Sequence, residues 1–539
     1  MERFSDLLDD LYFTNSNLAK ETILTNYLRE TPDPNRGWAL AAIAGTLSFD
    51  LFKRNVIKTL MMERMDPFLF DMSRDYVGEM SETVALAWPQ SENPVRLNRL
   101  PDLETVITEF KSRNKAGIRD YLITLLDNMT PAQRWALLKL GTRGLRIGMS
   151  ARSVKLTLAK MKDVDVNVIE QIWHGLEPPY TDLFAWIDGR AELPDMSNIV
   201  TFSPVMLAHP IDEEKDLPRI TGQSHIAEWK WDGIRVQISS KGEETKIFSR
   251  KGDDISGSFP DLAQAVDFNG IIDGELLVKP DGKIGSFNDL QQRLNKKKPA
   301  KALMARLPAH VIAYDILEWE GETLRNLQLM DRRNVLADTV KAHQHGRFEL
   351  SETLDFKTTE DLKEFRETAA KTGGLIEGLM IKDKSSTYLS GRPKHAWYKW
   401  KRDPFLLDAV LMYAQRGTGK RSSYYSDYTF GLWNEEGALL PIGKAYFGFT
   451  DEELKKLDNW IRSHKLARYG PVQEVEKELV FEVAFDTAQE SKRHKSGYAL
   501  RFPRIHRIRW DKPAAEADKI SSVAKLVEDQ AARVRDAGT

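Results

Sequence analysis

The chain has 539 residues, of which 41% are hydrophobic and 29% are charged, and a length of this kind indicates about three to four domains. Its 78 basic and 80 acidic side chains nearly cancel, which excludes a wholly basic, histone-like binder but not a local basic surface for nucleic acid. The chain contains no cysteine. Disulfides, thiolate nucleophiles and cysteine-ligated metal sites are therefore excluded.

Targeting signals are absent from the sequence pattern. Residues 1–13 contain several acidic side chains and no apolar h-region, so we predict no signal peptide. The apolar runs are much shorter than the ~20 residues of a transmembrane helix. These features predict a cytoplasmic protein that does not cross a membrane.

Residues 1–203 have the pattern of helices. In "TPAQRWALLKLG", Thr130 is expected to cap a helix, Pro131 to occupy its first position and Gly141 to end it. Ser150 is expected to cap the next helix. No internal repeat is apparent. We predict an all-α domain over 1–203.

Residues 204–402 alternate in the way that strands do. The expected strands are "HIAEWKWDGIRVQISS", "ETKIFSR", "GIIDGELLV" and "AHVIAYDILEWEG", with helices at "RRNVLADTVKAH" and "TEDLKEFRETAAK". We predict an α+β domain over this range.

Residues 403–539 contain about five short β-runs and one helix, "TDEELKKLDNWIRSH", which predict a small β-barrel of the OB-fold type. A terminal helix is expected at the end of the chain. The complete prediction is a multidomain protein with an all-α domain, an α+β domain and a β-barrel domain, with boundaries 1–203, 204–402 and 403–539.

A Lys-x-Asp-Gly pattern occurs twice. The copy at Lys279–Gly282 contains Pro-Asp-Gly and predicts a hairpin turn. The copy at Lys230–Gly233 lies between two expected strands, where the lysine can reach a cleft. A lysine attacks only as the neutral amine, so burial and the cationic neighbours Arg235 and Arg250 are expected to lower the pKa of Lys230.

Several further motifs follow Lys230 in a fixed order. They are "SRKGDD", "IIDGEL", "AYDIL", "EGLMIK", "WYKWK" and "LRFPRIHRIRWDK". The ordered set resembles the motifs of covalent nucleotidyltransferases, most closely those of ATP-dependent DNA ligases, over roughly residues 200–515. The segment "GTRGLRIGMS" at 141–150 also resembles the helical DNA-binding domain of the longer ligases.

The resemblance implies a role for each matching position in the nucleotide site. Lys230 is implied as the nucleophile that forms lysyl-AMP, Glu228 as the reader of the adenine amino group, and Tyr314 as the ring that stacks on adenine where the family usually has Phe. Glu275 and Glu377 are implied as ligands of Mg²⁺, because carboxylates are the oxygen donors that this ion prefers. The other implied nucleotide contacts are basic: Arg235, Arg250, Lys382, Arg392, Lys399, Lys401, Arg509 and Lys512.

Residues 489–512 carry eight basic and two acidic side chains. By strand alternation, Arg507 and Arg509 are expected to share one face and Arg504 to lie on the other. In the family, the end of this segment orients the departing pyrophosphate. In the helical domain, Arg143, Arg146 and Gly148 are expected to approach the DNA backbone without reading bases.

The implied function is ATP-dependent sealing of nicks in duplex DNA. Lys230 is adenylylated, AMP passes to the 5′-phosphate, and the 3′-hydroxyl attacks and releases AMP. The implied cofactors are ATP, as AMP donor, and Mg²⁺, and the implied partner is nicked double-stranded DNA. A monomer in the cytoplasm or the nucleoid is expected, with a hinge near Lys401–Pro404. The expected processes are DNA replication, repair and recombination.

Three other classes share part of the pattern. An mRNA-capping guanylyltransferase would use GTP, and neither it nor an RNA ligase accounts for the helical first third. A NAD⁺-dependent ligase is disfavoured, because that family usually carries a four-cysteine zinc site. A DNA-binding module with a degenerate nucleotide site is the non-enzymatic alternative.

Overall fold

The computed structural model describes residues 1–47, 50–70, 73, 79–142, 144–196, 199–294, 296, 298–343, 346–416, 425–446, 450–469, 472–491 and 494–537. Its contacts divide the chain into two units, Met1–Ser197 and Asn198–Thr539. Within these units, the predicted boundaries of three domains stay predictions. No helix among the described residues combines the length and apolar character needed to cross a bilayer.

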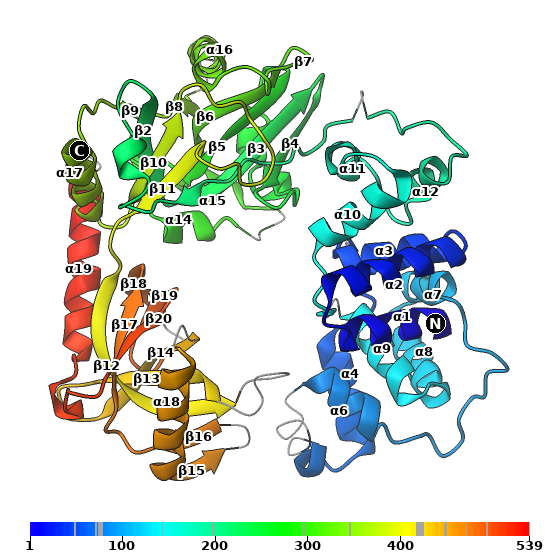
Figure 1. Cartoon of the computed structure of the whole chain (residues 1–539). Helices are drawn as coiled ribbons and strands as arrows, with labels where there is room; N and C mark the ends of the chain where they lie inside the picture. The colour runs from blue at the N-terminus through cyan, green and yellow to red at the C-terminus, as the bar shows by residue number, and fades with distance from the viewer. Residues whose placement is uncertain are drawn as a thin grey trace. The chain divides into compact units, whose positions relative to one another are not determined.

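The first unit consists of helices, and its described residues contain no strand, which confirms the all-α prediction (Figure 1). Buried leucine, isoleucine, phenylalanine and tryptophan side chains from these helices form one continuous core. The helices are α1 (Glu2–Phe13), α2 (Asn17–Glu30), α3 (Asn35–Ala44), α4 (Arg54–Arg64), α6 (Met80–Ala87), α7 (Leu103–Ser112), α8 (Lys115–Asn128), α9 (Pro131–Gly141), α10 (Ala151–Lys162), α11 (Val166–Trp173) and α12 (Thr181–Ile187).

The two helix starts predicted from capping residues are correct. Thr130 and Gln133 form a reciprocal capping box at the start of α9, with Pro131 at its first position. The Ser150 side chain accepts a hydrogen bond from the backbone N–H of Ser153 at the start of α10. Helix α9 ends at Gly141, as expected, and a side chain at this position would collide with the ring of Phe52, 2.1 Å away.

The first unit contains an internal repeat, contrary to our expectation. Residues 53–60, "KRNVIKTL", and residues 151–158, "ARSVKLTL", share Arg, Val, Thr and Leu at equivalent positions. Each segment starts a helix and follows a loop that begins with Gly-Thr, at Gly45 and Gly141. The loops differ in length by two residues, which hides the repeat from a search at fixed spacing. The similarity is confined to these segments: Gly45 caps α3 with a φ of 74°, whereas Gly141 is the last residue of α9.

The first part of the second unit is built on two sheets (Figure 1). One sheet has the strand order β1-β11-β10-β2-β9, and the other has the order β4-β3-β5-β6-β7 with β8 added beside β6. The strands are β1 (His209–Pro210), β2 (His225–Trp231), β3 (Ile234–Lys241), β4 (Glu244–Ser249), β5 (Gly270–Val278), β6 (Ala309–Trp319), β7 (Glu322–Thr323), β8 (Phe348–Leu350), β9 (Thr353–Leu354), β10 (Ile376–Asp383) and β11 (Trp397–Lys401). The helices of this part are α13 (Pro260–Ala263), α14 (Phe287–Gln291), α15 (Lys301–Arg306), α16 (Leu329–Ala342) and α17 (Thr359–Ala370).

The turn at Lys279–Gly282 forms, but the predicted hairpin does not. Asp281 and Gly282 adopt positive φ angles of 50° and 80°, as the Pro-Asp-Gly chemistry suggests. The chain then continues into α14, and β5 pairs with β6 instead of with the residues that follow the turn. The partner of β5 is set by burial of its faces and lies 30 residues further along the chain.

The last part of the second unit is a barrel. The sheet runs β13-β14-β20-β17-β12, and β12 also pairs with β13, which closes a ring of five strands. This confirms the predicted OB-type barrel. The sequence analysis missed the four short strands β15, β16, β18 and β19. The elements are β12 (Phe405–Arg416), β13 (Tyr425–Trp433), β14 (Leu439–Tyr446), α18 (Asp451–Ser463), β15 (Lys465–Tyr469), β16 (Val472–Val475), β17 (Val480–Phe485), β18 (Thr487–Glu490), β19 (Tyr498–Arg501), β20 (Arg504–Arg509) and α19 (Ile520–Ala537).

One strand of the barrel departs from simple alternation. The pairing of β20 with β17 shifts by one residue between Ile505 and Arg507, and both Ile505 and Ile508 enter the core. At such a bulge, two consecutive residues of one strand lie opposite one residue of its partner, so both can face away from the core. In β20 these residues are His506 and Arg507. Arg504 therefore shares the outer side of β20 with Arg507 and Arg509, and the predicted opposition of these arginines is wrong.

Candidate functional site

A cavity of about 880 Å³ contains most of the residues that the sequence motifs identified. Its walls come from both sheets of the second unit, because β2, β10 and β11 belong to one sheet and β3, β5 and β6 to the other. The predicted residues that line it are Glu228, Lys230, Arg235, Arg250, Glu275, Tyr314, Glu377, Lys382, Lys399 and Lys401. Among the predicted nucleotide-site residues, Arg392, Arg509 and Lys512 are not in the lining.

Lys230 lies near the end of β2 and is directly opposite Gly378 of β10. The backbone at Gly378 has a φ of 143°. A Cβ at this position would lie 2.1 Å from the carbonyl oxygen of Trp400. Only glycine therefore lets β2, β10 and β11 come together at the level of the lysine. Lys230 Nζ donates a hydrogen bond of 2.5 Å to Glu377 Oε2.

The electrostatic surroundings of Lys230 differ from those expected. Burial alone would lower the pKa of Lys230, but the charges of Glu377 and Glu275 outweigh it and raise the pKa above its ordinary value. The expected lowering by neighbouring cations is therefore wrong for the free site. Glu377 shows the complementary effect: burial would raise its pKa, but Lys230 and Lys401 lower it to about 2.

The pKa values of two other carboxyl groups of the site are raised, in contrast to that of Glu377. Burial raises the pKa of Glu275 to about 8, with a further contribution from Glu377. Burial and the charge of Glu377 also raise the pKa of Asp232, the acidic member of the Lys-x-Asp-Gly motif, to about 6, although Arg501 opposes the shift. The site thus gathers three carboxyl groups that a bound cation would stabilise in their charged form.

We expect the second-order rate constant for modification of Lys230 by a nucleotide to rise steeply with pH. The free site holds the lysine as an ammonium ion, so the fraction of neutral amine grows by about tenfold per pH unit below its pKa. Single-turnover rates at subsaturating ATP, measured between about pH 7 and pH 10, test this. Glu377→Gln removes the largest raising charge and should move the profile to lower pH; a profile that is flat in both proteins would contradict the assignment.

Glu228 lies two residues before Lys230 on the same strand, where it is buried and bound by two cations. Its Oε1 accepts a hydrogen bond of 2.5 Å from Arg333 Nη1, and its Oε2 lies 2.5 Å from Lys382 Nζ. The ammonium of Lys382 also lies over the rings of Tyr314 and Trp397, at 4.5 and 4.6 Å from their centroids. The sequence motifs identified Glu228 and Lys382, but Arg333 carried no signal.

Arg235 is held by a buried network centred on Asp273. Its guanidinium donates to both carboxylate oxygens of Asp273, at 3.0 and 2.6 Å, and to the carbonyl oxygen of Met206, at 2.7 Å. The hydroxyls of Tyr314 and Tyr388 donate to the same carboxylate, at 3.1 and 2.6 Å. Most N–H groups of Arg235 are therefore already used inside the protein. Asp273 belongs to the motif "IIDGEL", whereas Tyr388 carried no signal in the sequence.

Positive charge gathers at the Lys230 end of the cavity. Lys399 and Lys401 both line it, as their alternation on β11 predicts. Burial, followed by the charges of surrounding basic groups, lowers the pKa of Lys399. The basic groups are Arg392, Lys230, Lys401 and Arg250. Mutual repulsion among so many cations is relieved by a bound polyanion.

Arg509 and Lys512 are directed to carboxylates of the barrel. Lys512 Nζ lies 2.7 Å from Asp408 Oδ2, and Arg509 donates to Asp511 at 3.1 and 2.9 Å. Arg501 instead contacts the Lys-x-Asp-Gly motif. It forms an ion pair with Asp232, and its guanidinium lies 3.9 Å from the ring centroid of Phe287.

The residues predicted to contact DNA are in the first unit. Arg143 lies outside the described residues, whereas Arg146 and Gly148 are exposed. Gly148 has a φ of 66°, and a side chain there would lie 2.7 Å from Lys20 Nζ.

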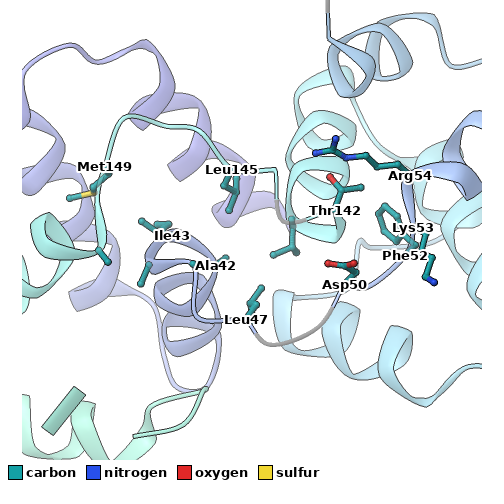
Figure 2. Close-up of a pocket in the computed structure, with 14 residues that line it drawn as sticks. Ala42, Ile43, Leu47, Asp50, Phe52, Lys53, Arg54, Thr142, Leu145 and Met149 are labelled. Carbon is teal, nitrogen blue, oxygen red and sulfur yellow. The ribbon is translucent and has the colours of Figure 1, made fainter. Parts of the chain in front are cut away.

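A cavity of about 640 Å³ in the first unit lies between the two repeated loops (Figure 2). Asp50, Phe52, Lys53 and Arg54 line it from the first copy of the repeat. Thr142, Leu145, Met149 and Ala151 line it from the second copy. Lys53 and Arg54 are exposed, and neither forms an ion pair with another described residue.

Family models match both parts of the second unit. The model described as "ATP dependent DNA ligase domain" matches residues 205–401, and the model described as "ATP dependent DNA ligase C terminal region" matches residues 421–512. The first matched range contains Lys230, and the second contains the barrel strands β13, β14, β17 and β20.

Curated relatives are similar along most of the chain. A "Probable DNA ligase" of Koribacter versatilis is 32% identical over 440 residues, which cover 76% of this chain and 74% of the relative. A "DNA ligase" of Methanoculleus marisnigri is 32% identical over 74% of this chain and 72% of its own length. The solved structure titled "Pmar-Lig_PreS3" has a TM-score of 0.60 at 18% identity and covers 94% of this chain and 99% of that one, which shows a shared fold.

Proposed function

Because this chain belongs to the ATP-dependent DNA ligase family, we propose that it seals nicks in duplex DNA through a lysyl-AMP intermediate on Lys230. The neutral Lys230 amine attacks the α-phosphorus of ATP, a P–N bond forms, and the bond to the departing pyrophosphate breaks. AMP then moves to the 5′-phosphate of a nick. The 3′-hydroxyl attacks that phosphate, a phosphodiester forms, and AMP leaves.

The observation that carries this proposal is the single cavity that gathers the motif residues from six strands of two sheets. We assign its cationic end, with Lys399, Lys401 and Arg250, to the triphosphate, where positive charge stabilises the developing negative charge of phosphoryl transfer. We assign the end with Tyr314, Glu228 and Lys382 to the base. Arg235 supports the ribose and phosphate region from its anchor on Asp273.

The carboxyl groups of Glu275 and Glu377 fit Mg²⁺. They are hard oxygen donors that line the same cavity, and burial raises the pKa of Glu275, a shift that a bound cation would oppose. A bound Mg²⁺ would offset phosphate charge and orient phosphate oxygens. Glu377 in addition accepts a hydrogen bond from Lys230 Nζ. This bond holds the nucleophile in position until the amine attacks.

The experiment that tests the function uses the full chain, α-labelled ATP and Mg²⁺. A labelled protein band should form, and nicked duplex DNA should discharge the label and yield a sealed strand. A band that forms with GTP alone would favour the capping-type alternative. If mass spectrometry shows unadenylylated protein and no nucleotide labels it, the chain is a DNA-binding module instead.

We assign the DNA contacts of the first unit to Arg146 and Gly148, with Arg143, and to the repeated segment with Lys53 and Arg54. Both copies of the repeat begin a helix after a Gly-Thr loop, and both loops border one cavity (Figure 2). Helix starts offer unpaired backbone N–H groups to phosphate oxygens, and adjacent arginine or lysine adds charge. The repeat thereby supplies two backbone contacts, which suits a protein that must accept any base sequence.

We expect Arg54→Glu and Arg146→Glu to weaken binding to nicked duplex DNA by similar factors. Each loss should reduce the slope of log affinity against log salt by about 1, since one phosphate contact is removed. Fluorescence anisotropy across a salt series measures this. Arg29→Glu, at an exposed arginine of α2, is the matched control. Equal slopes for Arg54→Glu and Arg29→Glu would remove the first copy of the repeat from the DNA interface.

We further propose the three domains 1–203, 204–402 and 403–539, with the hinge at Lys401–Pro404, in a protein that acts as a monomer on DNA in the cytoplasm or nucleoid. The barrel would move about the hinge, because Arg509 and Lys512 bind carboxylates of the barrel instead of lining the cavity. Limited proteolysis at the hinge should change when ATP or nicked DNA is added, and an unchanged pattern would count against this motion.

A further inference from the structure

The base end of the cavity contains a buried carboxylate between two buried cations. The side chains of Glu228, Arg333 and Lys382 are 2%, 8% and 1% exposed. Burying one carboxylate with two cations is costly unless the geometry is specific, because each charge loses its hydration. The arrangement therefore needs an explanation beyond stability of the fold.

Each group of the cluster is held by further contacts. Arg333 belongs to α16 and donates a second hydrogen bond to the carbonyl oxygen of Ser351, so its guanidinium bridges two segments. Lys382 is confined between the rings of Tyr314 and Trp397. With one oxygen held by each cation, the Glu228 carboxylate cannot rotate without breaking a charged contact.

Together, Glu228 and Lys382 present a hydrogen-bond acceptor beside a hydrogen-bond donor. A carboxylate has about four lone-pair sites, so Glu228 can still accept from a ligand, and the three N–H groups of Lys382 exceed what one carboxylate oxygen takes. Adenine carries an amino donor next to the ring acceptor N1, which matches this order. Guanine has a carbonyl acceptor in place of the amino group and an N–H in place of N1, so both contacts would become repulsive.

We infer that Arg333 is a positioning residue that sets the preference for ATP over GTP by fixing the orientation of the Glu228 carboxylate. Arg333 lies outside the lining of the cavity and reaches the base only through Glu228. Removing it leaves Glu228 held on one side, free to turn and to pair fully with Lys382. The acceptor and the donor for the base then disappear together. This inference rests on the proposed function, because it assumes that the cavity binds ATP.

The test measures lysyl-nucleotide formation with α-labelled ATP and with α-labelled GTP for the wild type, Arg333→Met and Arg333→Lys. Loss of a charged, buried contact predicts that Arg333→Met lowers the ATP-to-GTP ratio of second-order rate constants by about 10- to 100-fold. The effect should lie in KM for ATP, with the maximal rate changed by less than about threefold, because the reacting phosphate is untouched. Arg333→Lys keeps a cation and should recover part of the ratio.

Arg332→Met is the matched control. Arg332 precedes Arg333 on α16, is fully buried, and donates to both oxygens of Asp315 at 2.7 and 2.9 Å. Arg332→Met should lower the melting temperature of the protein without changing the ATP-to-GTP ratio of rate constants. An unchanged ratio and KM in both Arg333→Met and Arg333→Lys would overturn the inference, whereas a wild type that forms no lysyl-AMP would overturn the proposed function itself.

Discussion

Lys230→Ala is expected to abolish the labelled protein band and to reduce nick sealing from ATP by at least about 1,000-fold, because it removes the amine to which the phosphoramidate is assigned. In the cavity, Lys230 donates a hydrogen bond to Glu377 at the junction of β2, β10 and β11, whereas Lys401 forms a longer ion pair of 3.4 Å with the same carboxylate. Lys399 and Lys401 are nearby, but they lie on β11 and are assigned to the phosphates. Incubation with α-labelled ATP and Mg²⁺, followed by a denaturing gel, measures the effect.

Two controls make the Lys230 result specific. Lys279→Ala changes the lysine of the second Lys-x-Asp-Gly match, which lies in a turn and pairs with Glu349, and it should leave labelling unchanged. Nicked DNA that already carries AMP on its 5′-phosphate bypasses the lysine, so Lys230→Ala should seal it within about tenfold of the wild-type rate. Labelling that survives in Lys230→Ala would assign the nucleophile to another residue.

Asp273→Asn is expected to destabilise the second unit strongly. The carboxylate is fully buried and accepts hydrogen bonds from Arg235, Tyr314 and Tyr388. Burial raises the pKa of Tyr388, as does the charge of Asp273, so that hydroxyl stays a donor. Removing the carboxylate charge leaves the Arg235 guanidinium buried without a counter-ion, which costs about 3–5 kcal/mol.

Urea unfolding of the full chain, followed by hydrogen exchange in each unit, measures this loss. The free energy of unfolding should fall for residues 198–539 and remain unchanged for residues 1–197. Asp212→Asn removes an exposed ion pair with Lys215, 2.7 Å long, and should leave both units as they are. A loss for Asp273→Asn no greater than for Asp212→Asn would show that the network contributes little to stability.

The identities of the site residues were readable from the sequence because each belongs to a short motif. Strand-like runs contain the four central residues of the site, Lys230, Glu275, Glu377 and Lys399. In each run, the glycines and the alternation indicate which face of the strand carries the side chain. Helix starts at Thr130 and Ser150 were readable for a similar reason, since capping depends on residues within one turn. The hairpin after Lys279 failed because strand pairing depends on distant partners.

The residues that carried no signal act through contacts between distant segments. Arg333 meets Glu228 across 105 positions and Tyr388 meets Asp273 across 115 positions of the chain. No local pattern distinguishes such an arginine or tyrosine from an ordinary core or surface residue. The bulge in β20, which brings Arg504 to the side of Arg507, likewise follows from pairing with β17.

The sequence by itself determined the helical first part, the barrel at the end and the family, and it predicted the nucleophile, because periodicity, capping and ordered motifs are properties of neighbouring residues. Only the tertiary structure decided the charge environment of Lys230, where Glu377 and Glu275 outweigh burial and raise the pKa instead of lowering it. It also decided that Glu228 is held between Arg333 and Lys382. Charges act through space across strands, so their balance exists only once the sheets are assembled.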